Sequence, residues 1–312
     1  MDNENIIKIL NGIYALICLI GFLSNLLTFF VYSCKKFFKS IFWTYFRILC
    51  FFDIITLLNR VDYFFTVFEL INLKELSNVT CKLANFISYF CPSTSAWILV
   101  IISLDRFACV CLPFKFMFRK KTQFQLYVSL FIIIYNSIIF VPLYFLSEIY
   151  HDPDLNQTIN NGCSINNGII FDWLYIVNST LIPFLIMLLS TFFTLRRLFK
   201  SRKNNNTSLA ADSIKKKDIK FAFTSIGLNM SFFVLNFPFS LYTIMESLIQ
   251  IDYYVDYFIY IFLSILYYSH YGTLFYVSFI VNKSFRNELV GCLNKINSNK
   301  VARPSFKSSV FT

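Results

Sequence analysis

Six long uncharged runs limit what this chain can fold into. Each is 22 to 26 residues long and contains no Asp, Glu, Lys or Arg; they cover residues 9–34, 83–104, 122–147, 173–195, 221–245 and 257–282. A helix of about 20 residues spans the roughly 30 Å hydrocarbon core of a bilayer. Because lipid offers the backbone no hydrogen-bond partners, runs of this length are expected to cross as helices. With 57% hydrophobic residues, the chain has more apolar surface than a soluble domain buries.

A seventh span is predicted from about Ile41 to Phe68, where charged side chains interrupt the apolar run. These are Arg47, Asp53, Arg60 and Asp62. Without this span, the Cys81 end of the next run would lie on the side of the positively charged loops. We therefore expect an all-α membrane protein, with residues 1–8 outside and a seven-transmembrane helix bundle over residues 9–281. A short amphipathic eighth helix over residues 282–296 and a cytoplasmic tail over residues 297–312 would follow.

Positive charge predicts the orientation of the bundle. Of the 28 Lys and Arg, only Lys8, Arg60, Lys74 and Lys82 fall on the side shared by the N-terminus and Cys81. Loops rich in Lys and Arg stay in the cytoplasm, so we expect a multi-pass plasma-membrane protein with its N-terminus extracellular. The net charge of +11 then belongs to the inner surface, where it attracts anionic membrane lipids, and we expect no nucleic-acid binding.

The expected outer side carries an excess of acids over its four bases. The 12 acids are Asp2, Glu4, Asp62, Glu69, Glu75, Glu148, Asp152, Asp154, Asp172, Glu246, Asp252 and Asp256. Such a surface attracts a cationic ligand. The same excess follows from the positive-inside bias alone, so both interpretations stay open.

Ionisable residues within the second span are candidates for function. Asp53 lies near its middle, where an ionised carboxylate costs several kcal/mol unless it has a partner or a proton. Asn59, Arg60 and Asp62 lie toward the outer end of the span. They form either a mutually satisfied cluster or the polar floor of a ligand cavity.

The nine cysteines do not make a disulfide scaffold. Only Cys81 and Cys163 are expected on the oxidising side, and two cysteines have one pairing. This bond would pin the loop between the fourth and fifth spans to the top of the third. Sequons make Asn156 and Asn78 candidates for N-glycosylation on the same side.

The chain on the inner side offers two further segments. Residues 200–217 are basic and Asn-rich, which predicts a solvated linker. After the seventh span, Phe285, Leu289 and Cys292 share one helical face at i, i+4 and i+7. This pattern predicts a helix lying on the membrane, with Cys292 a candidate for acylation.

Together these features resemble the rhodopsin-like (class A) G-protein-coupled receptors over nearly the whole chain. Cys81 lies 25 residues before Arg106 of the triplet Asp105-Arg106-Phe107, which resembles the family's Asp-Arg-Tyr. Asn25 and Asp53 resemble the polar anchors of helices one and two. Pro183 and Pro238 resemble the prolines of helices five and six.

The resemblance implies a switch that couples to a heterotrimeric G-protein. In the family, the Arg is held by its neighbouring Asp at rest and is released when helix six swings outward. The switch residues implied here are Asp105, Arg106, Phe107, Phe232, Pro183 and Pro238. A proline inside a helix removes a hydrogen bond, which suits Pro238 to be the pivot. Asn25, Asp53 and Ser95 match residues of the family's sodium site.

The sequence departs from the family pattern in helices four to seven. Helix four lacks its tryptophan, Thr191 replaces a helix-five Tyr, and Asn236 replaces the helix-six Trp. The helix-seven Asn-Pro-x-x-Tyr would fall on residues 274–278, which read Leu-Phe-Tyr-Val-Ser. We therefore expect weak or absent sodium modulation, with Asp53 pairing with His270 or staying protonated.

Two ligand classes do not fit. Opsins need a helix-seven lysine, and none occurs between Lys220 and Lys283; amine receptors need an acid where this chain has Ser88. We expect a peptide or other small extracellular ligand, without cofactor or metal, and the chain looks most like FMRFamide-type and related invertebrate neuropeptide receptors. The residues expected around the ligand, each of which is alternatively a packing residue, are Arg60, Asp62, Asn85, Ser88, Tyr89, Glu246, Asp256 and Tyr257.

Other functional classes are less consistent with the sequence. A transporter or channel would carry charges along a continuous path or show repeated halves, and only the second span is charged. An enzyme would need a metal cluster or a nucleophile–base pair, for which two histidines offer little. A chemosensory or non-signalling receptor-like seven-helix protein, favoured by the missing helix-seven motif, stays as the alternative.

Overall fold

The computed structural model describes residues 3–34, 37, 43–60, 74, 76–111, 122–151, 161–165, 168–203, 209–246 and 252–301. The first half contains α1 (Asn3–Ser33), α3 (Trp43–Leu58), α5 (Asn78–Cys111) and α6 (Thr122–Leu146). A two-stranded hairpin, β1 (Ser147–His151) with β2 (Asn161–Ile165), follows. The second half contains α7 (Gly168–Tyr175), a π-helix η3 (Ile176–Leu181), α8 (Ile182–Lys203), α9 (Leu209–Glu246), α10 (Tyr253–His270), α11 (Thr273–Val281) and α12 (Lys283–Val301).

The helices form a seven-transmembrane bundle. Among the described residues, five stretches are long and apolar enough to cross a membrane: Ile6–Ser33, Asn78–Cys111, Gln123–Leu146, Gly168–Lys200 and Ala222–Glu246. The bent pair Val255–His270 and Thr273–Val281 makes a sixth. The remaining member, α3, has 16 residues and ends at Leu58, where Asn59 and Arg60 form a turn. The helix is therefore shorter than the expected span of Ile41 to Phe68, and residues 61–68 lie outside the described part.

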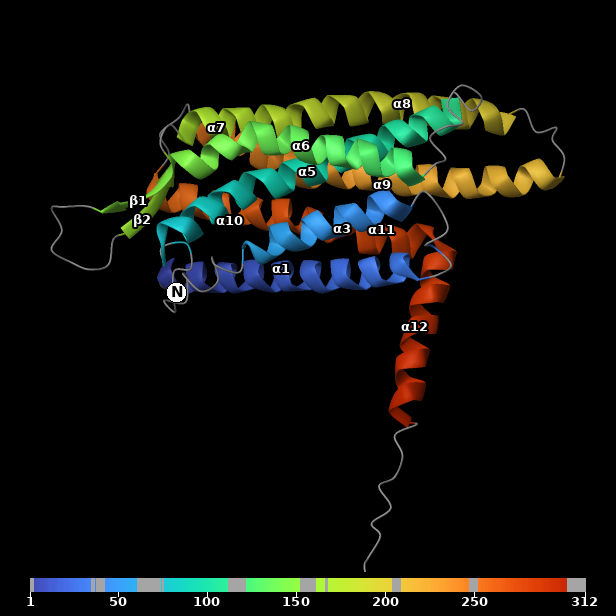
Figure 1. Cartoon of the computed structure of the whole chain (residues 1–312), viewed down its shortest axis with the longest axis horizontal. Helices are drawn as coiled ribbons and strands as arrows, with labels where there is room; N and C mark the ends of the chain where they lie inside the picture. Colours follow the sequence, from blue (N-terminus) through green and yellow to red (C-terminus); the bar gives the residue numbers. More distant parts are fainter. Residues whose placement is uncertain are drawn as a thin grey trace, which may run out of the picture.

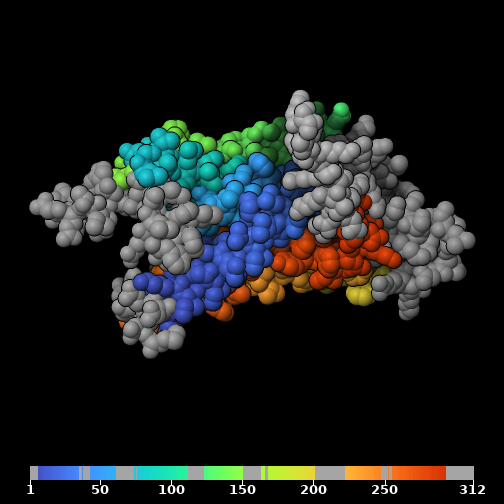
Figure 2. Space-filling view, turned by 90° about the horizontal axis from the view of Figure 1, so that it is seen from below, coloured from blue at the N-terminus to red at the C-terminus, as the bar shows by residue number. Residues whose placement is uncertain are grey.

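The membrane helices run side by side with α5 at the centre (Figure 1). It contacts α3, α6, α8 and α9, while α1 packs against α3, α10 and α11. Figure 2 shows the surface of α1 flanked by that of the C-terminal helices. The hairpin and the N-terminus lie at one end of the bundle (Figure 1), which we call the hairpin end; the end that carries Arg106 is the Arg106 end.

Apolar side chains are distributed as lipid requires. Tyr32 is fully buried and its ring lies 4.6 Å from that of Trp43 and 5.2 Å from that of Phe285. By contrast, Phe131 and Ile138 on α6 are each 71% exposed. Water would penalise such outward apolar side chains, whereas hydrocarbon does not.

Two transmembrane segments contain irregular turns. In the fifth, the Ile182 N–H donates to the Val177 carbonyl five residues earlier, and this π-turn directly precedes Pro183. Since proline has no N–H, the widened turn accommodates it without a break. In the seventh, the expected continuous helix is bent by 47° at Tyr271–Gly272.

The bend in the seventh segment depends on contacts with α1. A Cβ at Gly272 would lie only 3.2 Å from the Gly21 Cα, so glycine permits this close approach. Asn25 donates from Nδ2 to the Tyr271 carbonyl at 2.7 Å. Helix one therefore satisfies a carbonyl at the break, which gives the polar residue Asn25 a definite structural role.

The Arg106 end differs from the sequence-based expectation in two places. Helices α8 and α9 extend through most of the segment expected to be a solvated linker, since α8 ends at Lys203 and α9 begins at Leu209. Helix α12 leaves the bundle at a steep angle and ends at Val301, five residues beyond the expected boundary at 296. It is capped by Asn282, whose Oδ1 accepts the Ser284 N–H at 3.1 Å.

Candidate functional site

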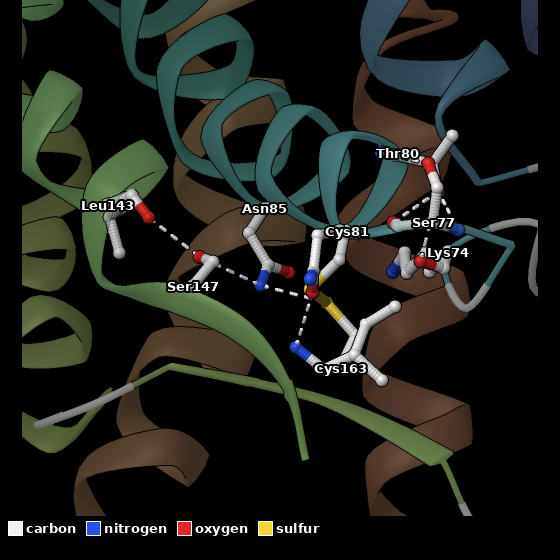
Figure 3. The surroundings of a disulfide bond; sticks show 10 residues. Lys74, Ser77, Thr80, Cys81, Asn85, Leu143, Ser147 and Cys163 are labelled. Atoms are coloured by element: carbon white, nitrogen blue, oxygen red, sulfur yellow. Dashed lines mark hydrogen bonds between the residues drawn. A yellow bond between two sulfur atoms is a disulfide. The ribbon is translucent and has the colours of Figure 1, made fainter. Parts of the chain in front are cut away.

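A disulfide attaches the hairpin to the start of α5 (Figure 3). Cys81 and Cys163 are bonded, with Cα atoms 5.6 Å apart, which is the pairing that the topology predicts. Asn85 donates from Nδ2 to Ser147 Oγ at 3.1 Å and to Cys163 Sγ at 3.3 Å. Asn85, expected around a ligand, thus braces the hairpin and does not line the cavity at this end.

The start of α5 is also tied to the hairpin. The Ser77 and Thr80 side chains each accept the other's backbone N–H, at 3.2 and 3.0 Å, in a reciprocal cap. Asn78 is exposed, and its Oδ1 accepts the Ile149 N–H of β1 at 3.1 Å. The other candidate glycosylation residue, Asn156, lies outside the described residues.

A cavity of about 560 Å³ opens at the hairpin end between the ends of α5, α7, α9 and α10. Four of the expected ligand-binding residues line it: Arg60, Ser88, Tyr89 and Glu246. Asp62 lies outside the described residues. Asp172 and several tyrosines also line the cavity, although their positions in the sequence gave no motif that would have identified them.

In the part of the chain that the structure describes, the cavity wall carries one cation and two carboxylates. The Arg60 guanidinium carbon lies 5.0 Å from the centre of the Tyr268 ring, in a cation–π contact. The Tyr89 hydroxyl donates to Asp172 Oδ1 at 2.6 Å, and Glu246 supplies the second carboxylate. A ligand in this space meets charges of both signs.

Two further residues expected around the ligand join helices instead. The Tyr242 hydroxyl donates to Asp256 Oδ1 at 2.7 Å, which links α9 to α10. Asn11 donates from Nδ2 to the Tyr257 hydroxyl at 3.2 Å, which links α1 to α10. Neither Asp256 nor Tyr257 lines the cavity.

A chain of tyrosine hydroxyls connects the cavity with the bend in the seventh helix. Tyr175 and Tyr267 line the cavity, and their hydroxyls are hydrogen-bonded to each other. The Tyr271 hydroxyl donates to that of Tyr267 at 2.8 Å. Tyr271 is also the residue whose carbonyl Asn25 binds. Hydrogen bonds therefore run from the cavity wall to the break between α10 and α11.

The intramembrane carboxylate has a different partner from the histidine expected for it. Asp53 is 4% exposed and its Oδ1 accepts a hydrogen bond from Ser95 Oγ at 2.5 Å. The His270 ring instead packs edge-on against Phe232, with centroids 5.4 Å apart, and its Nδ1 makes no hydrogen bond to any described residue. The Asp53–His270 pairing is therefore wrong, while protonation of Asp53 stays a prediction.

The charged pair at the opposite end of the bundle is closed. Arg106 Nη2 lies 2.5 Å from Asp105 Oδ2, and both side chains are buried at 6% and 7% exposure. Phe107 packs against Phe193 of α8 with ring centroids 6.1 Å apart. The triplet thus contacts the fifth transmembrane segment.

A buried polar cluster lies one turn from this pair. Asn229 of α9 donates from Nδ2 to Ser103 Oγ of α5 at 2.9 Å and to Thr191 Oγ1 of α8 at 2.7 Å. Ser103 and Ser190 hydroxyls are also bonded to each other. We call Ser103, Ser190, Thr191 and Asn229 the hydroxyl clamp, because it holds helices three, five and six together. Thr191 was noted as a departure from the family pattern, but its partner Asn229 was missed.

The comparisons agree with this architecture. The family model described as 7 transmembrane receptor (rhodopsin family) matches residues 24–271, from the middle of α1 to the bend in the seventh helix. No curated protein matches the chain. Because the match covers most of the 312 residues and the described helices form a bundle with a buried Asp-Arg pair, the chain belongs to the rhodopsin family of seven-transmembrane receptors.

Proposed function

We propose that this receptor binds an extracellular peptide in the hairpin-end cavity and activates a heterotrimeric G-protein at the Arg106 end. The observation that carries the proposal is the closed, buried Asp105–Arg106 pair at the opposite end of the bundle from a polar cavity. The positive-inside bias supports a plasma-membrane location with the hairpin end outside. Membrane lipids on the inner side are then partners of the basic surface.

The cavity supports a small peptide ligand of the neuropeptide kind. Asp172 and Glu246 suit a basic side chain or an N-terminal amine, while the Arg60 guanidinium suits a carbonyl or carboxylate oxygen. A volume of about 560 Å³ lies within the usual range for ligand sites. An amidated or basic peptide of the FMRFamide type would place only its last few residues in the cavity, where they would contact Arg60, Asp172 and Glu246.

The hydrogen bonds suggest how binding reaches the G-protein. A ligand that displaces Tyr175 or Tyr267 loosens the chain of hydroxyls that ends at the helix-seven bend. Outward movement of α9 requires the Asn229 bonds of the hydroxyl clamp to break. With α9 displaced, Arg106 exchanges Asp105 for the G-protein, which makes the pair one element of a two-state switch.

A screen of amidated neuropeptides, read out by calcium and cyclic nucleotide, tests the proposal on cells that express the chain. An active peptide should lose its response in Arg106→Ala and keep it in Arg196→Ala, an exposed arginine of α8. Surface labelling checks that both variants are expressed equally. An undiminished response in Arg106→Ala would contradict G-protein activation through this switch.

A chemosensory or non-signalling role is the second candidate. Asn236 supports it, because this residue is 2% exposed at the position of the family's helix-six Trp and its Nδ2 makes no hydrogen bond to a described residue. A receptor of this kind would bind a ligand without any response that depends on Arg106. Glycosidase treatment of Asn78→Gln and Asn156→Gln would show which sequon carries a glycan and hence which side faces outward.

A further inference from the structure

Two thiols meet at the Arg106 end, where α12 leaves the bundle. Cys34 directly follows α1 and Cys292 lies in α12, yet their Sγ atoms are 3.4 Å apart. Both side chains are half-buried. Two thiols 258 positions apart in the chain are thus in contact, outside the site described above.

A carboxylate completes the group. Glu288 precedes Cys292 by four residues on α12, so both side chains lie on one helical face. One carboxylate oxygen of Glu288 and the two Sγ atoms all lie within 4.8 Å of one another. Two residues of α12 and one residue that directly follows α1 thus place three potential metal ligands close together.

The surrounding packing holds these side chains in place. Phe285 and Leu289, on the same helix, are 0% and 9% exposed within the main apolar core. The Cys34 thiol lies 3.5 Å from the Phe30 carbonyl of α1, to which it donates a hydrogen bond. The three ligands therefore need little rearrangement to bind an ion, since both helices are already fixed.

We propose that Cys34, Glu288 and Cys292 bind one Zn²⁺ ion that joins α12 to α1. Tetrahedral zinc holds two thiolates about 3.8 Å apart, close to the separation seen here, and takes water as a fourth ligand. On binding, each thiol loses its proton to solvent and forms a Zn–S bond, with no change of oxidation state. The sequence did not predict this site, because the pairing of Cys34 with Cys292 requires the fold.

Two other uses of these thiols are less compatible with the geometry. A disulfide would need the sulfurs to approach from 3.4 Å to about 2.05 Å and lose two electrons, which the reducing cytosol opposes. Acylation of Cys292, expected from its place on an amphipathic helix, would consume the thiol that faces Cys34.

Metal titration of the full-length receptor, purified in lipid nanodiscs with a non-thiol reductant, tests the proposal. We expect one Zn²⁺ per chain in competition with a chelating indicator, and Co²⁺ should give thiolate-to-cobalt charge-transfer absorption. Cys34→Ser and Cys292→Ser should each weaken zinc binding by more than roughly 100-fold, and Glu288→Gln by about 10-fold. Cys111→Ser is the matched control, because its thiol is half-buried at the same end and contacts a carbonyl of α8.

Several results would overturn the proposal. These are wild-type receptor that binds no stoichiometric zinc, equal loss of binding in Cys111→Ser, and mass spectrometry that finds Cys292 fully acylated or disulfide-bonded to Cys34. Zinc should also raise the thermal stability of wild-type receptor and not that of Cys34→Ser. This readout does not depend on a peptide ligand or on G-protein coupling, so it fails or succeeds separately from the proposed function.

Discussion

Polar side chains are exposed at one end of the bundle and buried at the other. At the hairpin end, Asp172 and Glu246 are exposed and, with Arg60, face a cavity of about 560 Å³. At the Arg106 end, the residues of the hydroxyl clamp are at most 4% exposed and are bonded to one another. Polar groups at the first end have room to bind a solute. The buried polar groups at the Arg106 end can change partners only when the helices separate. Mutations at the two ends should therefore have different consequences.

Removing the disulfide, which is a crosslink at the hairpin end, should have the largest effect. Cys81→Ser or Cys163→Ser should each lower the free energy of unfolding by about 2–4 kcal/mol, because the crosslink restricts the unfolded chain. Thermal unfolding and surface expression measure this loss. The double variant should be no less stable than either single variant, since the second serine removes no further bond. A clear additional loss in the double variant would mean that the two cysteines act separately.

Arg60→Ala should raise the agonist concentration for half-maximal response by at least about tenfold, because a charged hydrogen bond contributes roughly 1.5–3 kcal/mol. Basal signalling should not change, since Arg60 lines the cavity at the hairpin end whereas the hydroxyl clamp lies at the Arg106 end. Concentration–response curves measure both quantities. Arg60→Lys keeps the charge but loses the planar stacking on Tyr268, so its shift should be intermediate. An increase in basal signalling without a shift of the curve would contradict the division between the two ends.

Asn229→Leu should show the reverse pattern. It removes two hydrogen bonds that hold α9 to α5 and α8, at a cost to the resting state of about 1–2 kcal/mol. Basal signalling should therefore rise severalfold to about tenfold, and agonist potency should increase as the active state becomes more populated. Met230→Leu, at a neighbouring 44% exposed position, is the matched control for α9. Unchanged basal signalling in Asn229→Leu would show that the clamp does not restrain the switch.

Tyr267→Phe should separate binding from transmission. The substitution keeps the ring that lines the cavity but removes the hydroxyl that joins Tyr175 to Tyr271. Because a ligand is proposed to act by loosening this chain, losing hydrogen bonds of about 1 kcal/mol should raise basal signalling about two- to fivefold, with a smaller change in agonist affinity. Radioligand binding and signalling, measured together, make the distinction. Tyr260→Phe, also on the cavity wall, should leave basal signalling unchanged.

The sequence predicted those parts of the receptor that depend on hydrophobic length and on single charged motifs. The bundle, the disulfide and the Asp105–Arg106 pair follow from run lengths, the positive-inside bias and one triplet. The bend at Tyr271–Gly272 was not predicted, because it depends on the close approach of Gly21 and on the Asn25 hydrogen bond. Hydropathy records that a segment is apolar, and it contains no information on whether its helix is continuous.

The candidate site was predicted only in part for a similar reason. Arg60, Ser88, Tyr89 and Glu246 line the cavity, whereas Asn85, Asp256 and Tyr257 join helices or the hairpin. Polar residues of both kinds look alike in a sequence, because a helix–helix hydrogen bond and a ligand contact require the same side chains. The hydroxyl clamp was missed since serine, threonine and asparagine in a membrane helix also bond their own backbone. Whether such a side chain contacts a ligand, a neighbouring helix or its own backbone depends on which helices pack together, and the sequence does not show this.

Sodium should have the smallest effect on this receptor. The Asp53 carboxyl is already bonded to Ser95, and the position at which the family has a helix-seven Asn is occupied by Leu274, which is 2% exposed and whose side chain has no oxygen. A cation of this size needs several oxygen ligands, so Asn25, Asp53 and Ser95 alone would bind it weakly. Replacing choline chloride by sodium chloride at constant ionic strength should therefore change agonist affinity by less than about twofold. A large sodium effect that disappears in Asp53→Asn would show that oxygens from elsewhere complete the site, and the bend in the seventh helix would be the first place to look for them.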